Sequence, residues 1–191
     1  MDYFSKSAEV LKSLNSQLEE IDVISRILKK RLNDGKKILI AGNGGSSADS
    51  QHFAGELTCT FNNRNRQPYS AISLMDNNSA LSAWSNDFNF NSYIERQLMA
   101  FGSKDDVFFV LSTSGGSKES KQSLNLINAC LYAKENDILV ISLVGKDGGE
   151  LHKISDHSIK VESKITSHIQ EAHIAIIHYI CNFLDYWSYF L

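Results

Sequence analysis

The sequence predicts an α/β protein: a doubly wound parallel sheet of five strands sandwiched by helices, with a long N-terminal helix. After Gly35, short apolar runs alternate with helical segments, and continuous apolar strands of this kind are typical of a parallel sheet covered on both faces. Right-handed crossovers between such strands produce two layers of helices. No low-complexity linker divides the 191 residues. We therefore expect a single domain over 1–191, with a helical segment 1–34 and an α/β sandwich 35–191.

The N-terminal segment has its own apolar pattern. Apolar residues recur every three or four positions from Phe4 to Leu32, which indicates one long amphipathic helix or two in sequence, ended by Asn33, Asp34 and Gly35. An apolar stripe of this length has to bury itself against something, and in a short chain the partner can be another subunit. We therefore expect a homo-oligomer.

The remaining elements follow from the alternation of patterns. Apolar runs predict strands at 37–41, 69–74, 107–111, 138–143 and 157–161. Helical spacing predicts helices at about 46–57, 79–101, 117–136 and 166–187.

Composition excludes several classes of protein. The chain is 42% hydrophobic and 21% charged, which is ordinary for a globular protein and argues against a disordered chain or a disulfide scaffold. A net charge of −3 offers no basic field for a phosphate backbone, so we expect no nucleic-acid partner. Cys59, Cys130 and Cys181 lack zinc or redox spacing, and no apolar stretch approaches the roughly 18 residues of a membrane span. We expect a cytoplasmic protein without a membrane partner.

Loops at the carboxyl ends of the strands carry the ligands in such folds. The first, residues 41–47, contains Asn43, Gly44 and Gly45 and leads from a strand into a helix. Glycines allow a ligand to approach the backbone closely, and the helix start offers free amide hydrogens. This pattern favours an anionic or polyhydroxy ligand, but it lacks the spacing of a nucleotide-binding loop. A tight turn without a ligand is the alternative.

The second loop carries four hydroxyl groups on Ser112, Thr113, Ser114 and Ser117 before a predicted helix. Hydroxyls at a helix start donate several hydrogen bonds to an anion, so this loop indicates a phosphomonoester site. Helix capping is the alternative, although four hydroxyls exceed what a cap needs. A third glycine-rich loop at 145–149 is interpreted as a turn.

Acid and base side chains lie on two predicted helices. His52 and Glu56 are separated by four residues and share one face of the helix 46–57. Gln170 and His178 lie within about 80° of each other on the last helix. These four side chains converge if the two helices pack closely. Three of the remaining histidines are interpreted as core or solvent-exposed residues: His152, His157 and His173.

Six segments together resemble a known family: 42–46 (GNGGS), 52–58 (HFAGELT), 86–88 (NDF), 112–115 (STSG), 145–149 (GKDGG) and 169–173 (IQEAH). Their order and spacing are similar to those of the phosphoheptose isomerases. These are sugar isomerase (SIS) domain enzymes that convert sedoheptulose 7-phosphate to glycero-manno-heptose 7-phosphate. The resemblance spans nearly the whole chain.

The resemblance implies an aldose–ketose isomerase with Glu56 and His178 as its proton-transfer pair. It implies phosphate contacts from Ser112, Thr113, Ser114 and Ser117. It implies sugar contacts from Asn43, Gly44, Gly45, Ser46, Asn86, Asp87 and Gln170. It also implies a homotetramer, and a zinc ion held by His52, Glu56, Gln170 and His178, a nitrogen and oxygen set that suits this ion.

Two positions depart from the family pattern. Cys59 and Thr60 stand where Gly-Arg is common, and His168 stands where Arg is common, so two cations that affect substrate contacts or subunit packing are absent. The alternative functions are a non-catalytic SIS adaptor of the initiator-associating type and a sugar phosphate binding protein. Those adaptors lack residues matching Glu56 and His178, so the isomerase is preferred. The pathway, lipopolysaccharide, capsule or another glycan, stays open.

Overall fold

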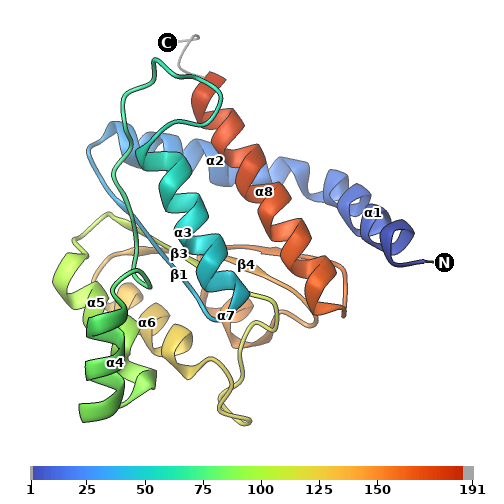
Figure 1. Ribbon diagram of the computed structural model, residues 1–191. Helices are drawn as coiled ribbons and strands as arrows, with labels where there is room; N and C mark the ends of the chain where they lie inside the picture. The colour runs from blue at the N-terminus through green and yellow to red at the C-terminus, as the bar shows by residue number, and fades with distance from the viewer. Residues whose placement is uncertain (1, 187–191) are drawn as a thin grey trace.

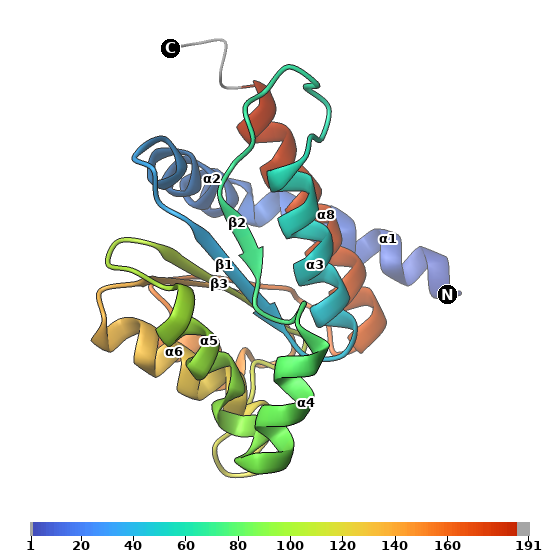
Figure 2. The same cartoon turned by 60° about the vertical axis from the view of Figure 1, so that its left-hand side comes forward.

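The structure is a computed structural model that describes residues 2–186 (Figure 1). A central sheet separates two layers of helices, as the turned view in Figure 2 shows. The strands are β1 (Ile38–Gly42), β2 (Ala71–Ser73), β3 (Val107–Ser112), β4 (Leu139–Val144) and β5 (His157–Lys160). The helices that follow β1 are α3 (Gly45–Thr58), α4 (Asn78–Asp87), α5 (Tyr93–Phe101), α6 (Leu124–Glu135), α7 (Gly149–Ile154) and α8 (Thr166–Tyr186).

All the paired strands are parallel, in the order β2-β1-β3-β4-β5. The chain passes from β1 outward to β2 and then returns to β3 on the other side of β1, where Ile38 pairs with Val107. The strand order therefore reverses between β1 and β3, and this switch point is where open α/β sheets bind ligands. The predicted doubly wound sheet is confirmed.

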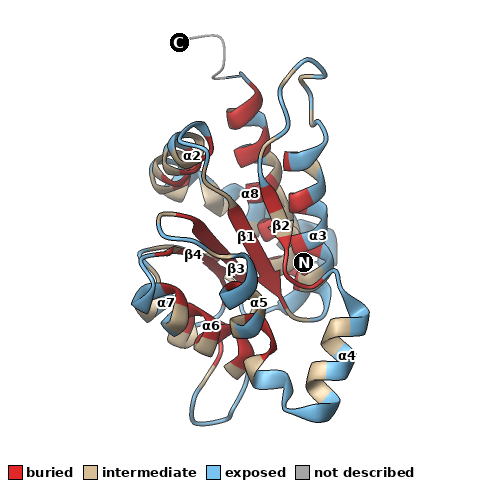
Figure 3. Ribbon diagram, turned by 90° about the vertical axis from the view of Figure 1, so that its left-hand side faces the viewer, coloured by how far each residue is buried: buried red, intermediate tan, exposed pale blue. Residues whose placement is uncertain are grey.

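Side chains of β1 divide the core into two halves because successive residues of a strand face opposite sides of the sheet. Ile38 and Ile40 pack with the layer formed by α2 (Leu18–Asn33), α3 and α8. Leu39 and Ala41 pack with the layer formed by α5, α6 and α7. Figure 3 shows that β1 is buried throughout, whereas α4 has no buried residue along its length.

The N-terminal segment consists of two α-helices. α1 (Tyr3–Ser13) and α2 are joined by the 3-10 segment Leu14–Gln17, so the alternative of two helices in sequence is the correct one. α2 buries Ile21, Ile24 and Leu28 against the sheet layer, but α1 buries no residue and leaves Phe4 80% exposed. The apolar stripe is therefore only half covered within one chain.

The predicted helix 79–101 is wrong, because the helix is interrupted between α4 and α5. Asn89 has extended backbone, and its side chain accepts a hydrogen bond from the amide of Ser92. This side chain caps the 3-10 turn Phe90–Ser92 that leads into α5. The predicted end of the last helix at residue 187 lies outside the described residues.

The predicted helix 117–136 begins later, at Leu124. The amide of Ser117 donates to the carbonyl of Gln122 at 2.9 Å and closes a turn. Lys121 and Ser123 have φ of 57° and 56°, a left-handed conformation that a helix does not accept. The four-hydroxyl loop therefore does not run directly into a helix, and the short helix α7 after β4 was not predicted from the sequence. Within residues 2–186, no helix has the length and apolar character needed to span a membrane.

Candidate active site

Two facing helices bring three predicted acid and base side chains together. α3 and α8 run side by side over one face of the sheet (Figures 1 and 2). The Nε2 atoms of His52 on α3 and His178 on α8 lie 3.0 Å apart. The same His52 nitrogen lies 3.5 Å from Oε1 of Glu56, one turn further along α3. The ring of Phe61 stacks on His178 with centroids 5.6 Å apart. His52 therefore lies between Glu56 and His178, the two side chains that the family resemblance implies for proton transfer.

Gln170 lies elsewhere on the same helix pair. Its amide Nε2 donates to Oδ1 of Asp49 at 3.1 Å. A Cβ added to Gly45 would come within 2.5 Å of that amide nitrogen, so only glycine lets the side chain lie against the start of α3. Gln170 is thus held at the N-terminal end of α3, against the glycine-rich loop after β1, and it does not join the His52 and His178 pair.

Asp49 is a site residue that sequence reasoning missed. It is 6% exposed, its second carboxylate oxygen has no partner among residues 2–186, and burial raises its pKa. A buried polar atom without a partner costs free energy and so marks a place where a ligand can supply the missing contact. The available signal was spacing, since Asp49, His52 and Glu56 fall on one face of α3.

The loop after β1 is tied to the start of α6. Asn43 and Asn125 exchange two side-chain hydrogen bonds, with Nδ2 of Asn43 donating at 3.0 Å and Nδ2 of Asn125 donating at 2.7 Å. Asn125 is buried and was not predicted. Ser46 is also buried, at the first turn of α3, whereas Gly44 and Gly45 are exposed. The exposed peptides of this loop are the part that a ligand can reach.

The serine loop, residues 112–117, is organised by its own hydroxyl groups. Oγ of Ser112 accepts from the amide of Gly115 at 3.1 Å, and Oγ of Ser114 accepts from the amide of Gly116 at 3.3 Å. Oγ of Ser117 accepts from the amide of Ser120 at 3.2 Å, while Thr113 is half-buried. Oγ of Ser112 and Oγ of Ser114 also lie 3.4 Å apart, where one hydroxyl donates to the other, so at least one of the two keeps its proton available for an anion.

The third glycine-rich loop packs directly against the serine loop. The amides of Glu150 and Leu151, at the start of α7, donate to the carbonyls of Gly116 and Gly115 at 3.1 and 2.9 Å. A Cβ on Gly149 would lie 2.3 Å from the Gly116 carbonyl oxygen, so a side chain does not fit there. The loop is a turn, as interpreted from the sequence, and it also fixes the orientation of the serine-loop peptides.

A polar cavity of about 320 Å³ opens between these two loops. Its walls include Ser114 and Ser117 from the serine loop and Lys146 and Lys153 from the facing segment. Asn86 and Asp87 are placed differently, exposed on the last turn of α4, where the Asn86 amide donates to Asp87 Oδ1 at 2.8 Å. They bond to each other and not to the His52, Glu56 and His178 group.

The predicted zinc ligands fit the ion only in part. With zinc bonds of about 2.0–2.2 Å, two donors of a tetrahedral site lie roughly 3.4 Å apart, close to the His52, His178 and Glu56 separations. The fourth ligand, Gln170, instead bonds to Asp49. As the side chains stand, residues 2–186 contain no group of three or more His, Cys, Asp or Glu arranged to hold a metal ion. The four residues therefore do not form a complete set.

The two positions that depart from the family pattern have different surroundings. Cys59 is exposed at the end of α3. His168 is 2% exposed, and within the described part of the chain neither ring nitrogen has a hydrogen-bond partner. The ring of Tyr3 from α1 meets it edge-on with centroids 4.5 Å apart. A buried imidazole thus occupies the place of the usual arginine.

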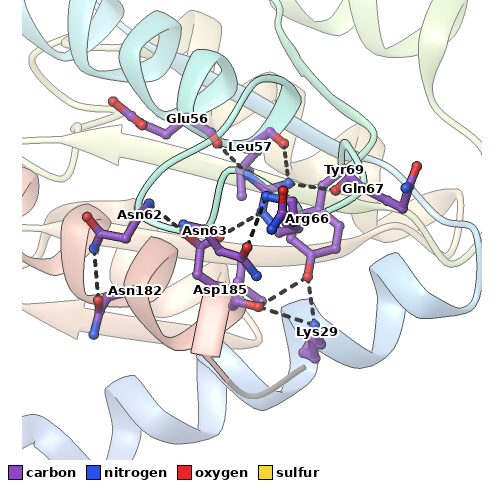
Figure 4. A network of polar contacts seen from close by, with 12 residues as sticks. Lys29, Glu56, Leu57, Asn62, Asn63, Arg66, Gln67, Tyr69, Asn182 and Asp185 are labelled. Carbon is purple, nitrogen blue, oxygen red and sulfur yellow. Dashed lines mark hydrogen bonds and ion pairs between the residues drawn. The ribbon is translucent and has the colours of Figure 1, made fainter. Parts of the chain in front are cut away.

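A buried ion pair between Arg66 and Asp185 was not predicted from the sequence. Nε of Arg66 donates to Oδ1 of Asp185 at 2.7 Å, and the two side chains are 4% and 1% exposed (Figure 4). Arg66 lies in the α3–β2 loop, residues 59–70, and Asp185 lies near the end of α8. A loop arginine gives no periodic signal. The only clue was a single carboxylate in the apolar face of the last helix.

These features define a class: a doubly wound sheet with a glycine-rich loop and a serine loop on either side of its switch point, as in sugar isomerase domains. The model of the SIS domain family matches residues 2–145. Phosphoheptose isomerase 1 of Campylobacter jejuni is 41% identical, covering 94% of this chain and 90% of its own length. A Helicobacter pylori phosphoheptose isomerase is 39% identical, covering 96% and 92%.

A solved structure gives the same result. Phosphoheptose isomerase from Neisseria gonorrhoeae matches with a TM-score of 0.87 and 35% identity, covering 96% of this chain and 95% of that one. The chain belongs to the SIS domain family. Within it, the chain belongs to the phosphoheptose isomerases.

Proposed function

We propose that this protein is an aldose–ketose isomerase that converts sedoheptulose 7-phosphate to D-glycero-D-manno-heptose 7-phosphate through an enediol. The observation that carries the proposal is the convergence of Glu56, His52 and His178 between α3 and α8. The names of its relatives support this substrate. The product is a precursor for heptose in bacterial surface glycans, and we place the enzyme in the cytoplasm.

The reaction moves two protons and no net charge. Glu56 removes the proton from C1 of the ketose, while the oxygen on C2 takes up a proton and an enediol forms. The protonated Glu56 then returns its proton to C2, and the oxygen on C1 loses its proton to give the aldose. His178 is suited to exchange the oxygen-bound protons, because an imidazole both donates and accepts near neutral pH. His52 hydrogen-bonds to His178 and orients it.

The phosphate of the substrate is assigned to the serine loop. Ser112, Thr113, Ser114 and Ser117 supply hydroxyl donors, and hydrogen bonds to an ionised group are stronger than those to a neutral one. The contacts of Gly115 and Gly116 with α7 support this assignment, because they hold the serine-loop peptides in one orientation before the ligand arrives.

The sugar chain is assigned to the loops between the phosphate and the proton-transfer pair. The residues proposed for this role are Asn43, Gly44, Gly45, Ser46, Gln170, Asn86 and Asp87. The unpartnered oxygen of Asp49 supports a polyhydroxy ligand here, because a sugar hydroxyl would supply its missing donor. Asn86 and Asp87 are exposed at the end of α4, so they take part only if the ligand or a second subunit reaches that surface.

Zinc is proposed as an accessory ion bound by His52 and His178, with Glu56 and Gln170 as further ligands of the family set. The ion would supply a positive charge that polarises a carbonyl oxygen. Gln170 would have to exchange its bond with Asp49 for the metal. The proton transfers described above are assigned to Glu56 and His178, and the ion would assist them through this polarisation.

We also propose that the protein assembles as a homotetramer. The exposed apolar side chains of α1, including Phe4 and Leu11, support an interface on this helix.

One assay separates the candidate functions. Purified protein is incubated with sedoheptulose 7-phosphate, and aldose formation is followed with and without a chelator. Aldose formation supports the isomerase, and its loss on chelation supports the zinc proposal. Binding of the sugar phosphate without turnover would instead favour a sugar phosphate binding protein, and neither binding nor turnover would favour an adaptor.

A further inference from the structure

Arg66 caps the helix that carries the proposed base. Its Nη2 donates to the backbone carbonyl of Glu56 at 2.9 Å, and its Nη1 donates to the carbonyl of Leu57 at 3.0 Å (Figure 4). Carbonyls in the last turn of a helix have no partner within the helix, and a cation placed there is also favoured by the helix dipole. Arg66 therefore holds the peptide of Glu56 itself.

The same guanidinium is anchored to the helix that carries His178. Its Nε bonds to Asp185, which lies about two turns beyond His178 and on the same side of α8. The other carboxylate oxygen of Asp185 accepts from the amides of Asn62 and Asn63 at 2.6 and 2.8 Å. The α3–β2 loop is thus tied to α8 at several points.

Two aromatic contacts fix the arrangement further. The guanidinium of Arg66 lies over the ring of Tyr69, 4.4 Å from its centroid, and the Tyr69 hydroxyl donates to the carbonyl of Leu184 at 3.2 Å. Phe61, from the same loop, stacks on the ring of His178. The loop therefore touches His178 at one end and the backbone of Glu56 at the other.

We propose that Arg66 is a positioning residue that sets the relation between Glu56 and His178 by joining α3 to α8. The inference rests on the proposed function, because it assigns these two side chains to proton transfer. A planar guanidinium reaches the Glu56 carbonyl and the Asp185 carboxylate at the same time. A lysine ammonium keeps the charge but is a single point that does not span both partners.

The discriminating variant is Arg66→Lys, with Arg64→Lys as the matched control on an exposed arginine of the same loop. We expect Arg66→Lys to fold, to keep KM for the sugar phosphate within about threefold, and to lose roughly 10- to 100-fold in kcat, because small misplacements of reacting groups have effects of this size. Arg64→Lys should behave as the wild type. Wild-type kcat in folded Arg66→Lys would overturn the proposal.

A merely structural role predicts a different outcome. Leu28→Ala, in the buried face of α2, removes apolar packing from the core but none of the hydrogen bonds of Arg66. If Leu28→Ala reaches the same melting temperature as Arg66→Lys and loses as much kcat, stability explains the effect and the proposal is wrong. Asp185→Asn serves as a second variant if Arg66→Lys does not fold, because the amide keeps the size of the carboxylate. It should show the same kcat loss.

A second readout does not require activity. The imidazole nitrogen signals of His52 and His178, measured by NMR and assigned with single His→Gln variants, should shift in Arg66→Lys and stay in place in Arg64→Lys. Unchanged signals in Arg66→Lys would contradict the positioning role. If the wild type fails to isomerise sedoheptulose 7-phosphate while the ring signals shift as expected, the proposed function fails and the positioning of the pair stands.

Discussion

His52 and His178 lie 126 positions apart in the chain, yet their Nε2 atoms are 3.0 Å apart across the contact between α3 and α8. Two ring nitrogens at this distance form a hydrogen bond only when one donates and the other accepts, so at least one of the two rings is neutral at that nitrogen. Glu56 lies 3.5 Å from the same His52 nitrogen, so the three side chains form one cluster.

Removal of a serine-loop hydroxyl should weaken substrate binding. Ser114→Ala removes an acceptor for the Gly116 amide and a donor to the phosphate. A hydrogen bond to a charged group contributes about 1.5–3 kcal/mol, so KM should rise roughly tenfold or more while kcat changes little. Steady-state kinetics measure this, with Ser16→Ala on the N-terminal segment as the control. Unchanged affinity in Ser112→Ala, Ser114→Ala and Ser117→Ala alike would refute the phosphate assignment.

Gly149→Ala should displace the serine loop. Its φ is +54°, and a Cβ there would press on the carbonyl of Gly116, so the loop has to move. Gly35→Ala is the matched control, because Gly35 also has a positive φ, +75°, but no atom lies within 4 Å of its added Cβ. Both variants should lose stability from backbone strain. Only Gly149→Ala should raise the Kd for inorganic phosphate; equal phosphate affinity in both would show that the contact has no role in binding.

His173 should make the protein less stable in acid. It is fully buried on α8, and burial lowers its pKa from 6.5 to about 4. The unfolded chain binds this proton as the pH falls below 6.5, but the folded chain does so only near pH 4. The free energy of unfolding should therefore fall by up to about 3 kcal/mol between pH 6.5 and pH 4.

The check is a urea titration series across this pH range. His173→Gln removes the titrating group, so the loss of unfolding free energy between pH 6.5 and pH 4 should become smaller by about 3 kcal/mol. The exposed His152→Gln should leave this loss unchanged. If His173→Gln loses as much unfolding free energy in acid as the wild type, other groups account for the acid sensitivity.

The exposed face of α1 should form a subunit interface. Phe4→Glu replaces an apolar side chain that is 80% exposed in one chain with a charged one. The fold of the subunit should therefore survive, while association should weaken because the interface would have to bury the charge. Analytical ultracentrifugation should give a tetramer for the wild type and smaller species for Phe4→Glu. A wild type that sediments as a stable monomer at micromolar concentration would contradict the assembly.

Local patterns predicted most of the fold and part of the site. The spacing of His52 and Glu56 placed both on one face of α3, because four residues make about one helical turn. The same reasoning grouped Gln170 with His178, but they are two turns apart, and Gln170 instead meets Asp49 at the other end of the helix pair. Which residues face each other across two helices depends on how the helices pack, which periodicity within one helix does not determine.

Loop contacts were the least predictable part. The sequence predicts one helix over 79–101, yet α4 ends at Asp87 and the Asn89 side chain caps a new turn. Arg66 gave no signal, since its partners lie on α3 and α8 and the interaction exists only in the folded chain. Short-range patterns describe helices and strands, whereas such contacts join residues that are distant in sequence.

The central claim is that Glu56 is the base that moves a proton between C1 and C2. The direct measurement is the turnover of sedoheptulose 7-phosphate by Glu56→Gln, together with its affinity for the substrate and with Glu9→Gln as an exposed control. Loss of a general base typically lowers the rate by about 10²- to 10⁴-fold, so we expect turnover to fall by at least this factor while the Kd stays near the wild-type value. Wild-type turnover in folded Glu56→Gln would contradict the account.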